Sequence, residues 1–371
     1  MHKNTPDLAV LASFSGDGGV ERMLLNLVNA FATRGLEVDL VLIKTRSRHL
    51  EEVHPSVRIV KLGSQHSATS LWPLVRYLRQ HNPQRLLVAK DRAGRLVVLA
   101  RMLARTKTRI ILRLGTNLSA ALAHRSGIKY WLRRAPMLLL YPCIDHIIAV
   151  SEGVRQDTLK VSDVEPDQVS VVRNPVLTPR LHELASQPPP HPWLLDPDIP
   201  VIMGAGRLTV QKDFSTLIRA FARLRAERPC RLIILGDGRQ DAQLRALATQ
   251  LEISDDLQLP GFTDNPYVYM ANAALFVLSS RWEGSPNVLT EAMTLGTPVV
   301  STNCPSGPDE ILDGGRYGPL VPVGDWQALA QAMRQVLSDP PSSDKLRDAV
   351  REYEVETSAN HYLKILGIEQ P

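Results

Sequence analysis

The sequence predicts an α/β protein made of two doubly wound, Rossmann-like domains, each with a parallel sheet covered by helices on both faces. Short apolar runs typical of buried strands alternate with segments of helical period along most of the chain. A proline-rich stretch divides this alternation into two halves. With 371 residues, 44% hydrophobic and 22% charged, the chain has the length and composition of a globular protein with two cores.

The first half is expected to begin with a strand, a glycine loop and a helix. The apolar run 8–14 leads into Gly16, Gly18 and Gly19, and apolar residues then recur at helical spacing over 20–34. The other elements expected in this half are strands at 38–43, 58–62, 86–89, 109–114, 144–150 and 169–172 and helices at 71–81 and 96–104.

Residues 186–198 are expected to form a linker, because their five prolines disfavour both helix and sheet. A domain of residues 1–185 would precede this linker, and a domain of residues 199–351 would follow it. The expected cleft lies between the two domains, where the carboxyl ends of the strands place their loops. The elements expected in the second half are strands at 201–205, 231–235, 257–259, 274–278 and 298–301 and helices at 214–227, 240–251, 288–295 and 326–338.

The net charge of +5 is distributed unevenly along the chain. Residues 1–190 hold 27 Lys and Arg against 15 Asp and Glu, and within 71–135 there are 15 basic residues and one acid, Asp91. Such a bias suits an anionic membrane surface, a phosphorylated acceptor or nucleic acid, although a solvated basic face would also explain it. Trp72, Tyr77, Tyr130 and Trp131 fall in this stretch without forming a recognised RNA-binding module, so no nucleic-acid partner is expected.

Three isolated cysteines (Cys143, Cys230, Cys304) have no metal-type spacing, which favours a reducing compartment and predicts no zinc site. Residues 1–7 are polar and do not resemble a signal peptide, and no apolar run approaches 18 residues. The expected location is therefore cytoplasmic, with a peripheral place on the inner face of the cell membrane.

The most informative segment is 280–302, which holds Glu283 and Glu291 eight residues apart. The loop between them offers backbone N–H groups and a helix start to a diphosphate, and the two carboxylates can accept hydrogen bonds from ribose or sugar hydroxyls. Two isolated glutamates would more often be a surface residue and a helix-face residue. The loop after the strand at 201–205 favours a ligand site over this structural interpretation, because Arg207 and Lys212 can neutralise the two phosphates. In the first half, Gly18 and Gly19 open another helix that can receive an anion.

The string Arg-Trp-Glu-Gly-Ser-Pro-Asn-Val-Leu-Thr-Glu-Ala-Met at 281–293 resembles the Glu-x7-Glu motif of the retaining glycosyltransferases of family four. With Gly16–Gly19, Gly204–Lys212 and Gly236–Gly238, the resemblance covers most of the chain in the family's order. The segment Cys304–Glu310 is similar to a subgroup that builds bacterial surface polysaccharides, lipopolysaccharide cores and lipid-linked oligosaccharides.

The resemblance implies a GT-B fold, no cofactor, no metal, and retention at the anomeric carbon. It assigns Arg207 and Lys212 to the pyrophosphate, Glu291 to the ribose and Glu283 to the donor sugar. It also implies that the final helix, roughly 352–367 within the segment 352–371, returns to the first domain. The other residues that it places at the nucleotide are Gly18, Gly19, Gly236, Ser285, Pro286, Asn287 and Val288.

The expected enzyme is therefore a hexosyltransferase. It would move a hexosyl or N-acetylhexosaminyl group from a UDP-sugar to a glycan or lipid-linked glycan in cell-envelope polysaccharide or lipopolysaccharide synthesis. One position departs from the family pattern. Where many relatives have a histidine that touches the donor sugar, this chain has Gly115, followed by Thr116 and Asn117, and His124 lies too far along to be its equivalent.

Three other interpretations remain open at this stage. A nucleotide-sugar epimerase would use the same fold, and a non-catalytic basic adaptor would bind lipid headgroups or nucleic acid. A dinucleotide-dependent dehydrogenase is suggested by Gly16-x-Gly18-x-x-Glu21 and by Asp39 as the ribose acid, although the third glycine is missing. Asp196-Pro197-Asp198 matches the pattern of the metal-binding carboxylate pair of other glycosyltransferases, but it lies in the expected linker rather than after a strand.

Overall fold

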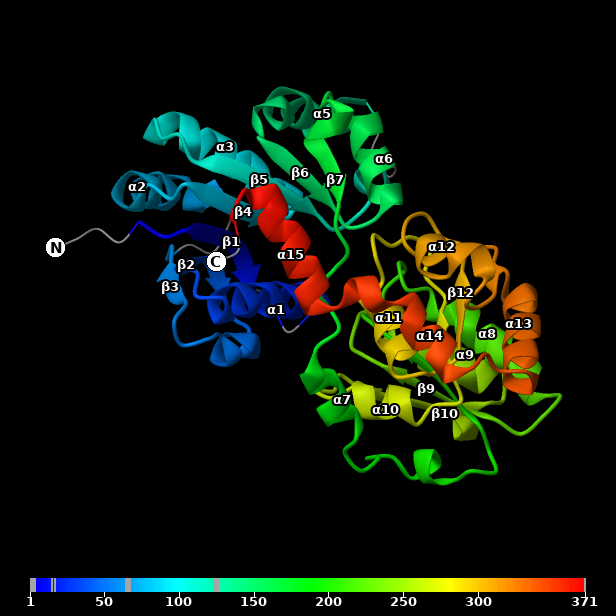
Figure 1. Cartoon of the computed structure of the whole chain (residues 1–371). Helices are drawn as coiled ribbons and strands as arrows, with labels where there is room; N and C mark the ends of the chain where they lie inside the picture. Colours follow the sequence, from blue (N-terminus) through cyan, green and yellow to red (C-terminus); the bar gives the residue numbers. More distant parts are fainter. Residues whose placement is uncertain (1–4, 15, 17, 64–67, 123–126, 370–371) are drawn as a thin grey trace. The chain divides into compact units, whose positions relative to one another are not determined.

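The computed structural model describes residues 5–14, 16, 18–63, 68–122 and 127–369, so that Asp17 and His124 lie outside the described residues. The chain divides into two compact units, Met1–Pro175 with Val355–Pro371, and Val176–Glu354 (Figure 1). Residues 176–185, assigned to the first domain from the sequence, and the proline-rich stretch 186–198 both fall in the second unit.

The first unit is built on a seven-stranded sheet with the order β3-β2-β1-β4-β5-β6-β7, and its paired strands are parallel. Its strands are β1 (Leu8–Phe14), β2 (Val38–Thr45), β3 (Arg58–Lys61), β4 (Arg85–Ala89), β5 (Arg109–Leu114), β6 (His146–Ala149) and β7 (Val169–Val171). Its α-helices are α1 (Gly19–Thr33), α2 (Leu71–His81), α3 (Asp91–Ala104), α4 (Leu118–Leu122), α5 (Gly127–Leu140), α6 (Glu152–Val161) and α15 (Val355–Leu366). Short 3-10 turns are η1 (Arg48–Glu52), η2 (Ala68–Ser70), η3 (Tyr141–Cys143) and η4 (Pro166–Gln168).

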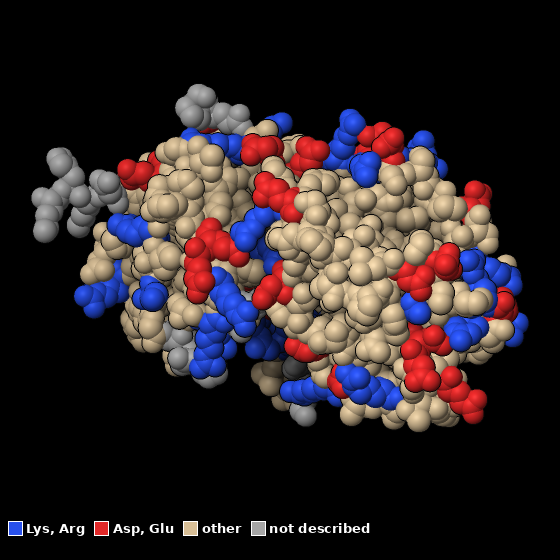
Figure 2. Space-filling model, turned by 90° about the horizontal axis from the view of Figure 1, so that it is seen from below, with Lys and Arg blue, Asp and Glu red and all other residues tan. Residues whose placement is uncertain are grey.

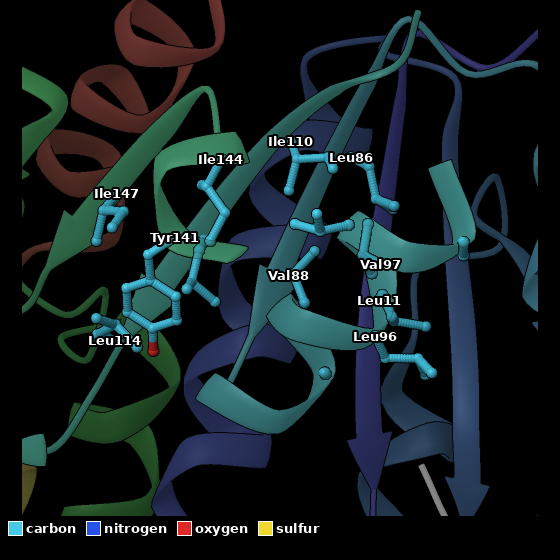
Figure 3. Packing of buried hydrophobic residues seen from close by; sticks show 14 of the residues in the cluster. Leu11, Leu86, Val88, Leu96, Val97, Ile110, Leu114, Tyr141, Ile144 and Ile147 are labelled. Carbon is cyan, nitrogen blue, oxygen red and sulfur yellow. The ribbon is translucent and has the colours of Figure 1, made fainter. Parts of the chain in front are cut away.

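Strand β1 shows how the sheet is covered on both faces. Ala9 and Leu11 point to a core formed with α2, α3 and α6, whereas Leu8 and Val10 point to a core formed with α1 and α15. This alternation follows from the two-residue period of a strand, and burial on both faces explains why β1 is apolar throughout. Figure 3 shows the first of these cores, with Val97 and Leu96 of α3 beside Val88 and Leu11 of the sheet.

The second unit has a six-stranded sheet with the order β10-β9-β8-β11-β12-β13, whose paired strands are also parallel. Its strands are β8 (Val201–Ala205), β9 (Arg231–Leu235), β10 (Leu257–Gly261), β11 (Leu275–Leu278), β12 (Val299–Thr302) and β13 (Leu320–Val321). Its α-helices are α7 (Pro179–Ala185), α8 (Phe214–Arg225), α9 (Asp241–Gln250), α10 (Tyr267–Ala271), α11 (Asn287–Thr294), α12 (Pro308–Ile311), α13 (Trp326–Ser338) and α14 (Ser343–Ala349), with 3-10 turns η5 (Pro192–Leu195), η6 (Ser254–Asp256), η7 (Asp313–Gly315) and η8 (Arg351–Tyr353).

The expected doubly wound α/β class is confirmed in both units. In each sheet the strand order reverses direction at the first strand. Strand β1 lies between β2 and β4, and β8 lies between β9 and β11, so the chain continues to one side of this strand first and to the other side later. These two places are the topological switch points. Doubly wound sheets bind their ligands outside the carboxyl ends of the strands at such a point.

Some elements differ from expectation. The helix expected at 96–104 begins five residues earlier, at Asp91, and the final helix begins at Val355, after η8. Helix α5 was not expected, because Pro136 lies inside it and basic residues interrupt its apolar pattern. Across the described ranges, no helix is long and apolar enough to cross a membrane.

Candidate functional site

The loops that follow β8 and β9 come into close backbone contact. The N–H of Gly206 donates to the carbonyl of Leu235 at 2.9 Å, and the N–H of Gly236 donates to the carbonyl of Gly261 at 2.8 Å. A Cβ atom on Gly236, whose φ is +130°, would overlap the carbonyl oxygen of Gly206. Glycine is therefore required at Gly236 both by the backbone conformation and by the approach of the neighbouring loop.

An ion pair joins the loop after β8 to the loop after β11, at the switch point of this unit. Lys212, in the loop after β8, places Nζ 2.6 Å from Oε1 of Glu283, in the loop after β11. The hydroxyl of Ser280 donates to the same oxygen at 2.6 Å. Both side chains of the pair are largely buried, with exposed fractions of 15% and 9%. The sequence predicted that both residues belong to the site, and the structure brings them into direct contact.

A second set of contacts holds the same two loops together. Arg281 Nε lies 2.9 Å from Asp213 Oδ2, and the backbone N–H of Arg281 donates to the carbonyl of Gln211 at 2.8 Å. The side-chain amide of Gln211 donates to the carbonyl of Trp282 at 2.9 Å. Sequence reasoning missed Asp213 and Gln211. Their positions beside Lys212, in the loop after the first strand of the unit, were the available signal.

Helix α11 carries the second glutamate of the motif. Glu291 is buried in the second turn, and the hydroxyl of Tyr267 lies 3.4 Å from its Oε1. Just before the helix, a Cβ atom on Gly307 would contact the ring of Pro286 at 2.6 Å, so the loop that precedes α12 packs directly against the start of α11. The segment Ser285–Pro286 is thus packed against Gly307.

Cys304 lies beside the Lys212–Glu283 pair and is buried. Burial, and then the negative charge of Glu283, raise the pKa of the Cys304 thiol to about 12. At neutral pH the thiol is therefore neutral, and this removes it as a nucleophile. Arg207, by contrast, is exposed in the same loop as Lys212.

In the first unit, Gly18 is the N-cap of α1 with extended backbone angles, and α1 begins at Gly19. These two residues lie directly beyond the carboxyl end of β1, as the sequence predicted. Glu21, in the first turn, is buried, and its carboxylate lies 3.2 Å from Lys90 Nζ.

The space beside Gly115 is taken by a buried arginine. Arg113 Nη2 lies 2.6 Å from Asn174 Oδ1, and a Cβ atom on Gly115 would overlap Arg113 Nη1. Burial lowers the pKa of Arg113 below its usual value, while Tyr362 of α15 opposes the shift. The absence of the family histidine at this position thus coincides with a larger polar side chain that fills the adjacent space.

The residues that suggested other functions have structural partners. Both carboxylate oxygens of Asp39 are bonded: Oδ1 accepts from Arg58 at 2.7 Å, and Oδ2 accepts from Arg58 and from Tyr77, both at 2.6 Å. Asp196 pairs with Arg231 at 2.9 Å. Within the described part of the chain, no three His, Cys, Asp or Glu residues are grouped as a metal site.

Comparison with known proteins then identifies the family. A model described as Glycosyltransferase Family 4 matches residues 17–180, and a model described as Glycosyl transferases group 1 matches residues 191–353. The chain belongs to the family-four glycosyltransferases. The predicted hexosyltransferase class is thereby confirmed, and membership in this family decides against the epimerase, adaptor and dehydrogenase alternatives.

Two relatives match this glycosyltransferase over nearly its full length. An N-acetylgalactosamine-N,N'-diacetylbacillosaminyl-diphospho-undecaprenol 4-alpha-N-acetylgalactosaminyltransferase of Campylobacter jejuni is 28% identical over 91% of this chain and 90% of its own. The lipopolysaccharide core biosynthesis glycosyltransferase LpsE of Rhizobium meliloti is 28% identical over 95% of this chain and 97% of its own.

Solved structures show the same fold. HepE of Anabaena, in complex with UDP and glucose, aligns with a TM-score of 0.78 at 20% identity, over 98% of this chain and 99% of that one. The lipopolysaccharide outer core galactosyltransferase WaaB aligns with a TM-score of 0.70 at 20% identity, over 97% and 99%. The expected GT-B fold is confirmed by these likenesses and by the two parallel sheets.

Proposed function

We propose that this glycosyltransferase moves a hexosyl or N-acetylhexosaminyl group from a UDP-sugar to a glycan or lipid-linked glycan acceptor. The reaction would retain the anomeric configuration and serve cell-envelope polysaccharide or lipopolysaccharide synthesis. The observation that carries the proposal is the Lys212–Glu283 pair at the switch point of the second unit. A cation for a diphosphate and a carboxylate for sugar hydroxyls lie side by side, where a doubly wound sheet binds its ligand.

The roles divide between the ends of the donor. Lys212 has three donor hydrogens, so its ammonium group can hold Glu283 and a diphosphate oxygen at the same time. Arg207, exposed in the same loop, adds a second cation for the departing UDP. Glu291 would accept from the ribose hydroxyls and Glu283 from the donor sugar. The backbone of Gly236 and of Ser285–Val288 would line the nucleotide within the second unit.

The activities and ligands of the relatives support the substrate class. HepE is described in complex with UDP and glucose, and also with UDP-glucose. The C. jejuni enzyme acts on a sugar carried by diphospho-undecaprenol and forms an alpha linkage, which is the product of retention when the donor is an alpha-linked nucleotide sugar. In retaining transfer, a phosphate oxygen of the leaving UDP can take the proton of the acceptor hydroxyl, so no side-chain base is required.

Glu291→Ala tests the donor assignment. Loss of one charge-assisted hydrogen bond costs about 1.5–3 kcal/mol, so the Kd for UDP measured by calorimetry should rise about ten- to a hundredfold. Glu227→Ala is a suitable control, because this exposed glutamate lies just beyond α8 and outside the motif. If the Glu291→Ala protein binds UDP as tightly as the wild type, the assignment of Glu291 to the nucleotide is wrong.

We also propose that transfer needs no metal, because Arg207 and Lys212 supply the positive charge that a divalent ion would otherwise bring to the diphosphate. Activity should then be the same in EDTA and in magnesium. Activity lost in EDTA and restored by magnesium or manganese would overturn this part of the proposal.

We further propose that the basic first unit docks on an anionic membrane, at the cytoplasmic face of the cell membrane. Its helices α2, α3 and α5 carry large exposed apolar side chains amid basic ones, a combination that suits an anionic bilayer. Asp91, the one acid of 71–135, is largely buried and bonded to Arg95 and Tyr141. By contrast, basic and acidic side chains are intermingled on the face drawn in Figure 2. The exposed apolar residues are Trp72, Leu99, Met102, Leu103, Ile128, Trp131, Leu132 and Leu139.

The proposed surface includes only those residues of these helices that are exposed. Met137 is buried in the core, whereas Leu132 and Leu139 are 70% and 73% exposed. Arg101 is not a free surface cation, because it pairs with Asp145. Arg133 is also largely buried, with 18% of its side chain exposed.

A triple Arg76→Gln, Arg105→Gln, Lys107→Gln protein tests the membrane surface, because all three cations are exposed. Binding to phosphatidylglycerol-containing vesicles at low salt should fall markedly in this variant, and in the wild type it should fall as salt screens the charges. A matched control changes Arg46, Lys61 and Lys160, which are also exposed in the first unit. A wild type that ignores anionic vesicles at low salt would refute the proposal.

A further inference from the structure

The first unit has an ion pair of its own at its switch point. Lys90 follows β4 directly, and Glu21 lies in the first turn of α1, which begins five residues after β1. Strands β1 and β4 are neighbours. After β1 the chain continues to β2 on one side of the sheet, and after β4 it continues to β5 on the other side. The Lys90 Nζ–Glu21 Oε1 distance of 3.2 Å therefore spans the position where such a sheet places its ligand.

The backbone at Lys90 is unusual for a lysine. Its φ is +80°, a region that residues with a Cβ atom rarely adopt. Strained backbone of this kind is concentrated at functional sites, where the surrounding structure holds a side chain in one direction. Here the strained residue directs its ammonium group to Glu21 while 46% of its side chain stays exposed.

The surroundings of the pair carry a surplus of positive charge. Arg92 is exposed next to Lys90, and Asp91 between them is already bonded to Arg95 at 2.8 Å, with Arg133 at 3.9 Å. Because Asp91 is engaged by these two arginines, Lys90 and Arg92 are two cations beside one carboxylate, Glu21. A surplus of this kind favours an anionic ligand, whose phosphate oxygens lysine and arginine bind well.

The second unit offers an internal comparison. There the Lys212–Glu283 pair also joins the two loops at a switch point, with the lysine on the first strand's loop and the glutamate on the other. In the first unit the two residue types are exchanged, and Glu21 is the buried partner with 9% of its side chain exposed. Each unit therefore presents one cation and one carboxylate at its ligand-binding edge.

We infer that the Glu21–Lys90 pair binds the acceptor, and that the bound part is a sugar carrying a phosphate or diphosphate. Lys90, with Arg92, would hold phosphate oxygens, and the Glu21 carboxylate would accept from a sugar hydroxyl. The inference rests on the proposed function, since a transferase has to hold an acceptor as well as its donor. The phosphate could be free or part of a lipid-linked diphosphate.

The test measures binding of two probes with UDP present at saturation, so that the donor site is filled. One probe is inorganic pyrophosphate, and the other is undecaprenyl diphosphate in neutral phosphatidylcholine vesicles. Lys90→Ala should weaken binding about tenfold or more, because it removes the central cation. Glu21→Gln should instead strengthen the binding of pyrophosphate, because it removes a competing carboxylate. Lys160→Ala, at the exposed end of α6, is the control.

Opposite signs for the two variants separate ligand binding from a structural role, since breaking a purely structural pair would affect both in the same direction. Binding of both probes would show that the phosphate group alone is recognised, and binding of the vesicle probe alone would show that the lipid-linked form is required. A wild type that binds UDP but neither probe overturns this inference and leaves the proposed function standing. A wild type that fails to bind UDP contradicts the proposed function itself.

Discussion

Glu283→Gln is expected to lower kcat about a hundredfold while leaving the affinity for UDP unchanged or slightly raised. The amide keeps the shape of the side chain but loses the charge that would hold a hydroxyl of the donor sugar as the bond to UDP breaks. Removing one polar contact that acts in the transition state typically costs 10²–10³ in rate. The partner, Lys212, loses its counter-charge at 2.6 Å and becomes fully available to the diphosphate.

The measurement compares kcat with the Kd for UDP in the same preparation. Glu227→Gln is a matched control, since this exposed glutamate lies just beyond α8 in the same unit. Lys212→Ala should show the reverse pattern, with a clear loss of UDP affinity. Equal losses of turnover and UDP affinity in Glu283→Gln would assign Glu283 to the nucleotide instead of the sugar.

The sequence assigned Lys212 and Glu283 to one place, and the structure brings them together for a topological reason. In a doubly wound sheet the loops after neighbouring strands meet at one edge, so Lys212 and Glu283 could be assigned to one place while 71 residues apart. Their direct pairing was not predictable from spacing alone. The same holds for Asp213 with Arg281, because the pattern of a loop does not specify which side chains turn toward each other.

The elements of the fold were predicted where the apolar period was strong. The strands at 109–114, 201–205 and 231–235 have the expected bounds, because each contains a continuous apolar run that is buried on both faces of the sheet. Helix α5 was missed, since Pro136 lies inside it, basic residues interrupt its apolar pattern, and its exposed residues include Ile128, Trp131, Leu132 and Leu139. Periodicity identifies a helix by its buried apolar stripe, and the signal weakens when apolar residues also lie on the exposed face.

Gly115 shows another limit of the sequence. The sequence showed that the family's histidine is replaced by glycine, but it did not show why this position has no side chain. Gly115 does not have a left-handed φ, so the backbone alone would accept another residue. What excludes it is Arg113, two residues earlier, whose guanidinium lies in the space that a Cβ atom would need.

Gly115→His, which restores the family's residue, is therefore expected to destabilise the protein and to lower activity. Overpacking of a filled site costs about 1–3 kcal/mol, and Arg113 has little room to move because it is 3% exposed and bonded to Asn174. The free energy of unfolding from denaturant titration measures the effect. Asn117→His, two residues further along the same loop, is the control.

A double variant decides whether Arg113 is the cause. Arg113→Met removes the guanidinium from the space beside Gly115, so Gly115→His should cost less stability in that background than in the wild type. Residues in direct contact commonly couple by 0.5–3 kcal/mol in such a cycle. Additive effects of the two substitutions, or a Gly115→His protein as stable as the wild type, would show that the space beside Gly115 is free, and the lost histidine would need a different explanation.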